Sequence, residues 1–114
     1  MSEQKIFFHN GPDPWTDLGG GNRRRVILHT DELMVVEFAF EKGGIGALHN
    51  HPHVQASYVA EGQFEVTIGD RTDLLSAGDA FIVPSNIVHG VKALEAGRLV
   101  DSFTPHRADF LAST

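Results

Sequence analysis

Three of the seven histidines in this 114-residue chain lie within five residues, at His49, His51 and His53, and Gln55 follows two residues after the last. On a β-strand, side chains two residues apart point to the same face of the sheet, separated by about 7 Å. Imidazole nitrogens gathered in this way are ligands for divalent transition metals. The spacing therefore predicts a metal site to which a single strand contributes His49 and His51.

A complete site needs further ligands, and the chain offers two candidates. Gln55 shares the strand parity of the histidine pair, and His89, at the end of the turn-like segment PSNIVH, can come from a neighbouring strand. His53 is equally compatible with a contact behind the ligands and with an exposed position beside Pro52, so it is left out of the ligand set. The remaining isolated histidines are interpreted as surface residues: His9, His29 and His106.

The composition describes a single domain with a hydrophobic core. Hydrophobic residues make up 41% of the sequence and charged residues 21%, as in ordinary globular proteins. No apolar run approaches the roughly 20 residues that span a bilayer. The first residues also lack the basic and then apolar pattern of a secretory signal. We therefore expect a cytoplasmic protein with no membrane partner.

Residue counts exclude or disfavour further classes of protein. The sequence has no cysteine, which excludes disulfides, thiolate zinc sites and thiol catalysis. The net charge of −6 argues against a general nucleic-acid-binding protein. One basic cluster stands out, Arg23 to Arg25. It is either a solvated strand edge or a basic mouth for a small acidic ligand, and the sequence leaves that choice open.

The segments that must position these side chains alternate in polarity with a period of two. In residues 32–41 and 63–68 apolar side chains occupy every second position, and shorter apolar runs lie at 79–84, 89–94 and 98–103. Turns containing Gly, Asp or Asn separate these runs at intervals of about 8 to 12 residues, a pattern typical of an all-β sandwich or barrel. We therefore expect an antiparallel β-fold.

The first 22 residues differ from the rest of the chain. The segment NGPDPWTDLGGG carries two prolines and four glycines, which favour irregular structure. We predict an irregular N-terminal arm over residues 1–22, with Trp15 packing back onto the body, and one β-barrel domain over residues 23–114. The segment HRADFLAST, residues 106–114, is the place where a short helical turn is compatible with the sequence.

Two segments of the chain resemble the two motifs of the cupin family. The first motif is matched with glutamine in place of the usual glutamate, and the second with substitutions at positions 86 and 93. The matching residues are Gly43, His49, His51, Gln55 and Gly62 in the first motif and Gly78, Pro84 and His89 in the second. This resemblance implies a single-domain cupin, an antiparallel β-barrel jelly roll. It also implies a divalent metal ion held by His49, His51, Gln55 and His89.

The glutamine has a consequence for charge. Three neutral imidazoles and a neutral amide leave a divalent ion with its charge of about +2, whereas a carboxylate ligand would lower it to about +1. A more positive centre is better suited to bind an anionic substrate and to stabilise an enolate. The donor atoms suit Mn, Fe, Co, Ni or Zn and do not select among them.

The C-terminal segment LVDSFTPHRADFL carries a second group of candidate residues. By strand parity Asp101 and Phe103 share a face, and Arg107 lies just beyond. Each has an ordinary alternative: Asp101 as a strand-end charge in water, and Arg107 as a partner of Asp109 or Glu95. Together, however, these residues resemble the tail of the KdgF-type small cupins of pectin and alginate breakdown. Residues 19–28, 33–69 and 78–90 resemble that family as well.

The resemblance implies an enzyme of the isomerase or lyase type. KdgF-type cupins linearise 4,5-unsaturated monouronates, small anionic sugars, to open-chain keto-uronates. Carried over to this chain, the catalytic group would comprise Asp101, Phe103 and Arg107, and a homodimer is an expectation. Two alternatives stay open: another metal-dependent cupin enzyme such as a dioxygenase, which would leave Asp101 and Arg107 without a role, and a non-catalytic cupin that binds a small ligand.

Overall fold

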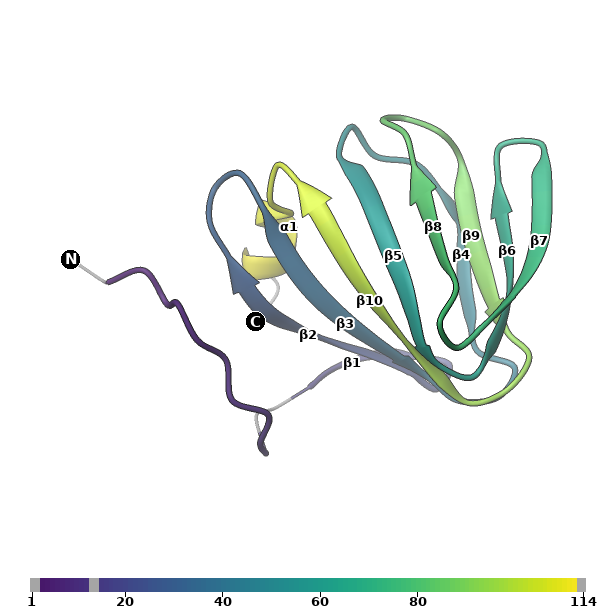
Figure 1. Ribbon diagram of the computed structural model, residues 1–114, viewed down its shortest axis with the longest axis horizontal. Coiled ribbons are helices and arrows are strands. Elements are labelled where there is room, and N and C mark those ends of the chain that lie inside the picture. The colour runs from purple at the N-terminus through teal and green to yellow at the C-terminus, as the bar shows by residue number, and fades with distance from the viewer. Residues whose placement is uncertain (1–2, 13–14, 113–114) are drawn as a thin grey trace.

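The computed structural model describes residues 3–12 and 15–112. In these residues the chain forms ten β-strands followed by one short helix (Figure 1). The strands are β1 (Thr16–Gly19), β2 (Asn22–His29), β3 (Met34–Phe40), β4 (Ile45–His49), β5 (Val54–Glu61), β6 (Gln63–Ile68), β7 (Arg71–Ser76), β8 (Ala80–Val83), β9 (His89–Ala93) and β10 (Gly97–Thr104), and the helix is α1 (Ala108–Ala112). No helix in the described residues is long and apolar enough to cross a membrane.

The strands form two antiparallel sheets that face each other (Figure 1). One has six strands in the order β1-β2-β3-β10-β5-β8, and the other has four in the order β4-β9-β6-β7. Strands distant in sequence are neighbours, since β10 lies between β3 and β5. The sheets approach at one end and spread apart at the other. The all-β jelly-roll prediction is confirmed, with two separate sheets rather than one closed barrel.

Apolar side chains from the inner faces of both sheets form the core. One cluster joins the two sheets: Phe40, Val59, Phe64, Val66, Ala93 and Leu99. A second cluster, Met34, Val36 and Phe103, packs against Phe38 and Phe110. The period-two alternation explains this arrangement, because every second side chain of β3, β6 and β10 points inward. Each fully buried large side chain contributes about 1.5–3 kcal/mol.

The opposite face of β3 is also covered, by charges rather than by apolar groups. Glu37 is 3% exposed and forms ion pairs with Arg25 of β2 and Arg98 of β10. Asn10 of the N-terminal arm accepts a further hydrogen bond from Arg25 at 2.8 Å. The arm therefore helps to hold a charged network on the outer face of the six-stranded sheet.

Part of the predicted irregular arm is regular. Strand β1 lies inside residues 1–22 and pairs with β2, and the chain reverses between them through Gly19, Gly20 and Gly21. All three glycines have positive φ angles, a conformation that residues with a Cβ rarely adopt. The glycines that suggested irregularity thus make a turn. Trp15 packs back as expected, with the guanidinium carbons of Arg23 and Arg25 at 4.7 and 4.5 Å from its ring centroid.

Candidate metal centre and its cavity

Three histidines from three segments meet at one point. His49 ends β4 and His89 begins β9, and the two are partners in the antiparallel ladder. His51 lies in the connection between β4 and β5. The candidate ligand nitrogens of the three all lie within 4.8 Å of one another. The predicted histidine pair and its partner from another strand are therefore brought together.

The prediction that a single strand carries His49, His51 and Gln55 is wrong, because they lie on β4, on the connection after it and on β5. Strand β4 stops at His49 and β5 starts at Val54. Pro52 lies between them, and proline has no N–H for a ladder and restricts the residue before it. His51 nevertheless remains buried, at 7% exposure. The break redirects the chain without removing His51 from the cluster.

Backbone carbonyls orient all three imidazoles in the same way. The Nδ1 atom of His49 lies 2.8 Å from the Ala47 carbonyl oxygen, and that of His89 lies 2.9 Å from the Ile87 oxygen. Nδ1 of His51 lies 3.1 Å from the carbonyl oxygen of His53. Such contacts fix the proton on Nδ1 and leave the Nε2 lone pair for an ion. His53 thus supports His51 through its backbone.

Gln55 links the histidine cluster to Asp101. Its Oε1 lies 3.1 Å from Nε2 of His51, and its Nε2 donates to Ser57 Oγ at 3.0 Å and to Asp101 Oδ2 at 3.3 Å. Because the amide nitrogen is committed to these two acceptors, the oxygen must face the histidines. The side-chain oxygen of Gln55 therefore faces the histidine cluster.

Burial tunes the histidines toward metal binding. It lowers the pKa of His51 and of His89 below the usual value for histidine, and the contacts with the His53 and Ile87 carbonyl oxygens oppose this shift only in part. A neutral imidazole has a free lone pair, whereas a protonated one does not. Both residues are thus competent ligands at neutral pH.

Asp101 lies beside this cluster and is 4% exposed. Its Oδ1 has no hydrogen-bond partner among the described residues. Burial raises the pKa of Asp101 to about 7, although the hydrogen bond with Ser57 and the positive charge of Arg107 act in the opposite direction. The carboxyl group therefore has one incompletely satisfied oxygen and exchanges its proton close to neutral pH.

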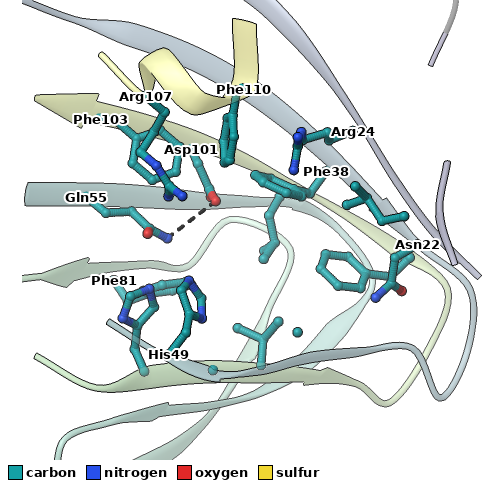
Figure 2. Close-up of a pocket in the computed structure, with 17 residues that line it drawn as sticks. Asn22, Arg24, Phe38, His49, Gln55, Phe81, Asp101, Phe103, Arg107 and Phe110 are labelled. Carbon is teal, nitrogen blue, oxygen red and sulfur yellow. Dashed lines mark hydrogen bonds between the residues drawn. The ribbon is translucent and has the colours of Figure 1, made fainter. Parts of the chain in front are cut away.

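A cavity of about 240 Å³ joins these groups (Figure 2). Its lining is aromatic and apolar apart from a few polar side chains: Asn22, Arg24, His49, Gln55, His89, Asp101 and Arg107. Phe103 lies at its wall, 5.7 Å from His51 between ring centroids. All of the predicted ligands and catalytic residues except His51 line the cavity, and His51 contacts Gln55, which does.

Arg107 pairs with Asp109, one of the two partners that its sequence position suggested, and it also lines the cavity. Its Nε and Nη2 atoms donate to the two carboxylate oxygens of Asp109, at 3.1 and 2.9 Å. Its guanidinium carbon also lies 5.2 Å from the Phe103 ring centroid and 4.2 Å from that of Phe110. Asp109 therefore holds Arg107 in place at the cavity wall, while Nη1 makes no hydrogen bond among the described residues.

Sequence reasoning did not identify every residue that lines the cavity or contacts its polar groups. Ser57 has the strand parity of Gln55, and this signal could have indicated it. Arg24 could not be separated from its two arginine neighbours, because their directions depend on pairing with β3. Phe110 required knowledge of where α1 packs, against Phe103 with ring centroids 5.7 Å apart.

The chain is similar in sequence to a known protein family and to a curated protein. A family model described as "Cupin domain" matches residues 36–103. The pectin degradation protein KdgF of Dickeya dadantii is 46% identical over 107 residues, covering 92% of this chain and 97% of that protein.

Solved structures of cupins are also similar to this chain. KdgF from a Halomonas species has a TM-score of 0.90 and 38% identity, with 94% of this chain and 99% of that chain covered. An RmlC-like cupin from Shewanella frigidimarina has a TM-score of 0.89 and 40% identity, covering 96% and 99%. The likeness thus extends over almost the whole of each chain.

Proposed function

The chain belongs to the cupin family, among the relatives of the pectin degradation protein KdgF, and from this membership we propose that it linearises 4,5-unsaturated monouronates. The reaction is a metal-dependent ring opening that converts the cyclic sugar acid to an open-chain keto-uronate. The substrates would be the small anionic sugars left when lyases cut pectin or alginate.

One observation carries the proposal: a single glutamine connects the candidate metal ligands to a buried carboxyl group in the same cavity. Gln55 faces His51 with its oxygen and Asp101 with its nitrogen. An ion-binding centre and a proton-transfer group can therefore act on one small molecule at the same time. A binding module has no evident need for a buried carboxyl group in this position.

The residues fit a divalent ion. Nε2 of His89 is buried and has no partner among the described residues, as expected for an atom whose partner is a metal. His49, His51, Gln55 and His89 would hold the ion, with Mn, Fe, Co, Ni or Zn all compatible with imidazole and amide donors. A bound ion would supply Lewis-acid stabilisation of negative charge on the oxygens of the substrate.

Asp101 is the proposed proton-transfer group. Its Oδ1 can accept the proton of the anomeric hydroxyl, and the bond between C1 and the ring oxygen then breaks as the C1 carbonyl forms. The electron pair leaves with the ring oxygen and gives an enolate over C5 and C4. Asp101 then returns the proton to C4, which completes the ketone at C5. The sequence is an isomerisation and consumes no other reactant.

Arg107 and Phe103 bind and enclose the substrate. Nη1 of Arg107 can donate to the substrate carboxylate while Asp109 fixes the rest of the guanidinium. Phe103 is 1% exposed and provides a flat apolar wall against the sugar ring, which excludes water from the enolate.

We propose two further properties on weaker support. A cytoplasmic location agrees with a sequence that has no cysteine and so does not depend on an oxidising compartment. A homodimer rests on the resemblance to small cupins, which often pair. Size-exclusion chromatography with light scattering would distinguish 12.5 kDa from twice that mass.

The reaction is tested by NMR with freshly generated 4,5-unsaturated galacturonate. Metal-loaded protein, chelator-treated protein and a sample without protein are compared, because ring opening can also occur spontaneously. We expect the open-chain keto-uronate to form fastest with metal-loaded protein. Equal rates in all three samples, with metal verified in the first, would contradict the proposed function. Oxygen consumption with phenolic compounds is measured in parallel and is expected to be absent, which separates this reaction from that of a dioxygenase.

A further inference from the structure

The structure shows where each of the three side chains of the basic cluster, Arg23 to Arg25, is directed. In the pairing of β2 with β3, Arg24 lies opposite Phe38, which points inward, and Arg25 lies opposite Glu37 on the outer face. Arg23 is exposed, and its guanidinium lies over Trp15. Only the middle arginine of the three lines the cavity (Figure 2).

Arg24 is held in a defined place relative to the catalytic group. Its guanidinium carbon lies 3.9 Å from the centroid of the Phe110 ring, and that of Arg107 lies 4.2 Å from the same centroid. Phe110 therefore contacts two guanidinium groups. Figure 2 shows Arg24 beside Phe38 and Phe110, with Phe110 between it and Asp101 and Arg107, and with His49 on the far side of the cavity.

The polar side chains at this end of the cavity are Arg24 and Asn22, which lies two residues before Arg24 on β2. Asn22 donates from Nδ2 to the Ile45 carbonyl oxygen at 2.8 Å, and its Oδ1 is buried. The guanidinium of Arg24 carries N–H donors, and the oxygen of a sugar hydroxyl accepts such hydrogen bonds.

The proposed substrates differ at the positions that would reach this end. Elimination across C4 and C5 removes the stereochemistry at both carbons. The pectin-derived and alginate-derived monouronates then differ at C2, so that the C2–C3 diol is trans in one and cis in the other. With the carboxylate and ring oxygen directed to the metal side, the diol is directed away from it.

We propose that Arg24 hydrogen-bonds the C2–C3 diol of the substrate and so determines the preference between pectin-derived and alginate-derived monouronates. The inference rests on the proposed function and extends it to substrate class. A planar guanidinium with fixed donor directions can satisfy one arrangement of two adjacent hydroxyls better than the other. Stacking on Phe110 limits its freedom to adapt, and this rigidity favours discrimination.

The test measures kcat and KM for both unsaturated monouronates with wild-type protein and with Arg24→Gln, Arg24→Lys and Arg23→Gln, all metal-loaded. For Arg24→Gln we expect the ratio of kcat/KM between the two substrates to change about tenfold or more. The change should lie mainly in KM, with kcat within about threefold, because Arg24 is placed away from the reacting atoms. Arg23→Gln is the matched control and should keep the wild-type ratio. Thermal unfolding verifies that each variant is folded.

A binding measurement separates this inference from the proposed reaction. Saturated glucuronate and mannuronate differ only at C2 and lack the C4–C5 double bond, so they cannot be converted to a keto-uronate and calorimetry reports recognition without turnover. A ratio of affinities that changes in Arg24→Gln and not in Arg23→Gln supports the role of Arg24 even if neither unsaturated sugar reacts. A wild-type protein without preference, or the same ratio in wild type and both Arg24 variants, would overturn it. If turnover fails while this binding effect is found, the proposed function alone is wrong.

Discussion

Glu37 and Asp101 are buried carboxylates on adjacent strands of the same sheet, and they face opposite sides of it. On the outer face, Arg25 and Arg98 both pair with Glu37. On the inner face, Asp101 receives a hydrogen bond from Gln55, and one of its oxygens is without a partner among the described residues. The two side chains are thus similarly inaccessible to solvent, but both carboxylate oxygens of Glu37 have ion-pair partners, whereas Asp101 has one oxygen without a partner among the described residues.

The difference suggests separate roles for the two faces of the sheet: the outer face contributes to stability and the inner face to the proposed reaction. A buried charge with a full set of partners favours the folded state, and its pKa falls below the usual range, as for Glu37. A buried carboxyl with an incomplete set is costly to ionise, and its pKa rises, as for Asp101. The outer network should therefore govern unfolding, and the inner group should govern turnover.

The largest expected effect is on the inner side, from loss of a proposed metal ligand. For His51→Ala we expect metal affinity to fall more than a hundredfold, since even residues that only support a ligand contribute ten- to a hundredfold. Turnover should fall to the rate measured without protein. Metal content after dialysis and NMR turnover check this, with the exposed arm residue His9 changed to Ala as the control. Normal metal content and turnover in His51→Ala would exclude His51 from the site.

The corresponding change on the outer side should act on stability alone. Glu37→Gln leaves the Arg25 and Arg98 charges without their shared partner, and we expect the free energy of unfolding to fall by on the order of 3 kcal/mol. The melting temperature should then fall by on the order of 10 °C. Turnover per folded molecule should stay at the wild-type value. Glu65→Gln, at an exposed position of β6, is the matched control. A large loss of turnover without loss of stability would remove the distinction between the two faces.

A smaller effect comes from the pH dependence of the same network. Burial raises the pKa of Glu37, and hydrogen bonds from Arg98 and Arg25 more than compensate, so the folded value lies below 4.5. A lowered carboxyl pKa gives stability that is complete above the unfolded value and is lost as the pH falls through the folded value. The difference in unfolding free energy between wild type and Glu37→Gln should therefore shrink from about pH 6 to about pH 3. Urea unfolding at each pH measures it, and a constant difference would contradict the assignment.

The sequence predicts the strands well where a local pattern determines them. Strands β3 and β6 follow from alternation, because burial on one face imposes a period of two. Alternation is a local feature and needs no knowledge of the remaining chain. The approach of His49 to His89 is expected from the resemblance to the two cupin motifs, and the structure pairs them in one ladder.

The sequence does not predict features that depend on register or on distant packing. The direction of Arg24 is determined by its pairing with Phe38, and the register of β2 with β3 shifts between Val26 and Leu28. A shift of one residue would point Arg25 into the cavity instead. The burial of Glu37 likewise depends on Arg98, which is 61 residues away in the sequence.

Turnover by metal-loaded Asp101→Asn tests the central claim most directly, namely that the ion-binding centre and Asp101 act together on one substrate. The substitution keeps the shape of the side chain and removes its ability to exchange a proton. We expect unchanged metal content and a loss of turnover on the order of a hundredfold or more, as for removal of a general acid–base group. A wild-type rate with full metal content would contradict the account and leave Asp101 without a part in the reaction.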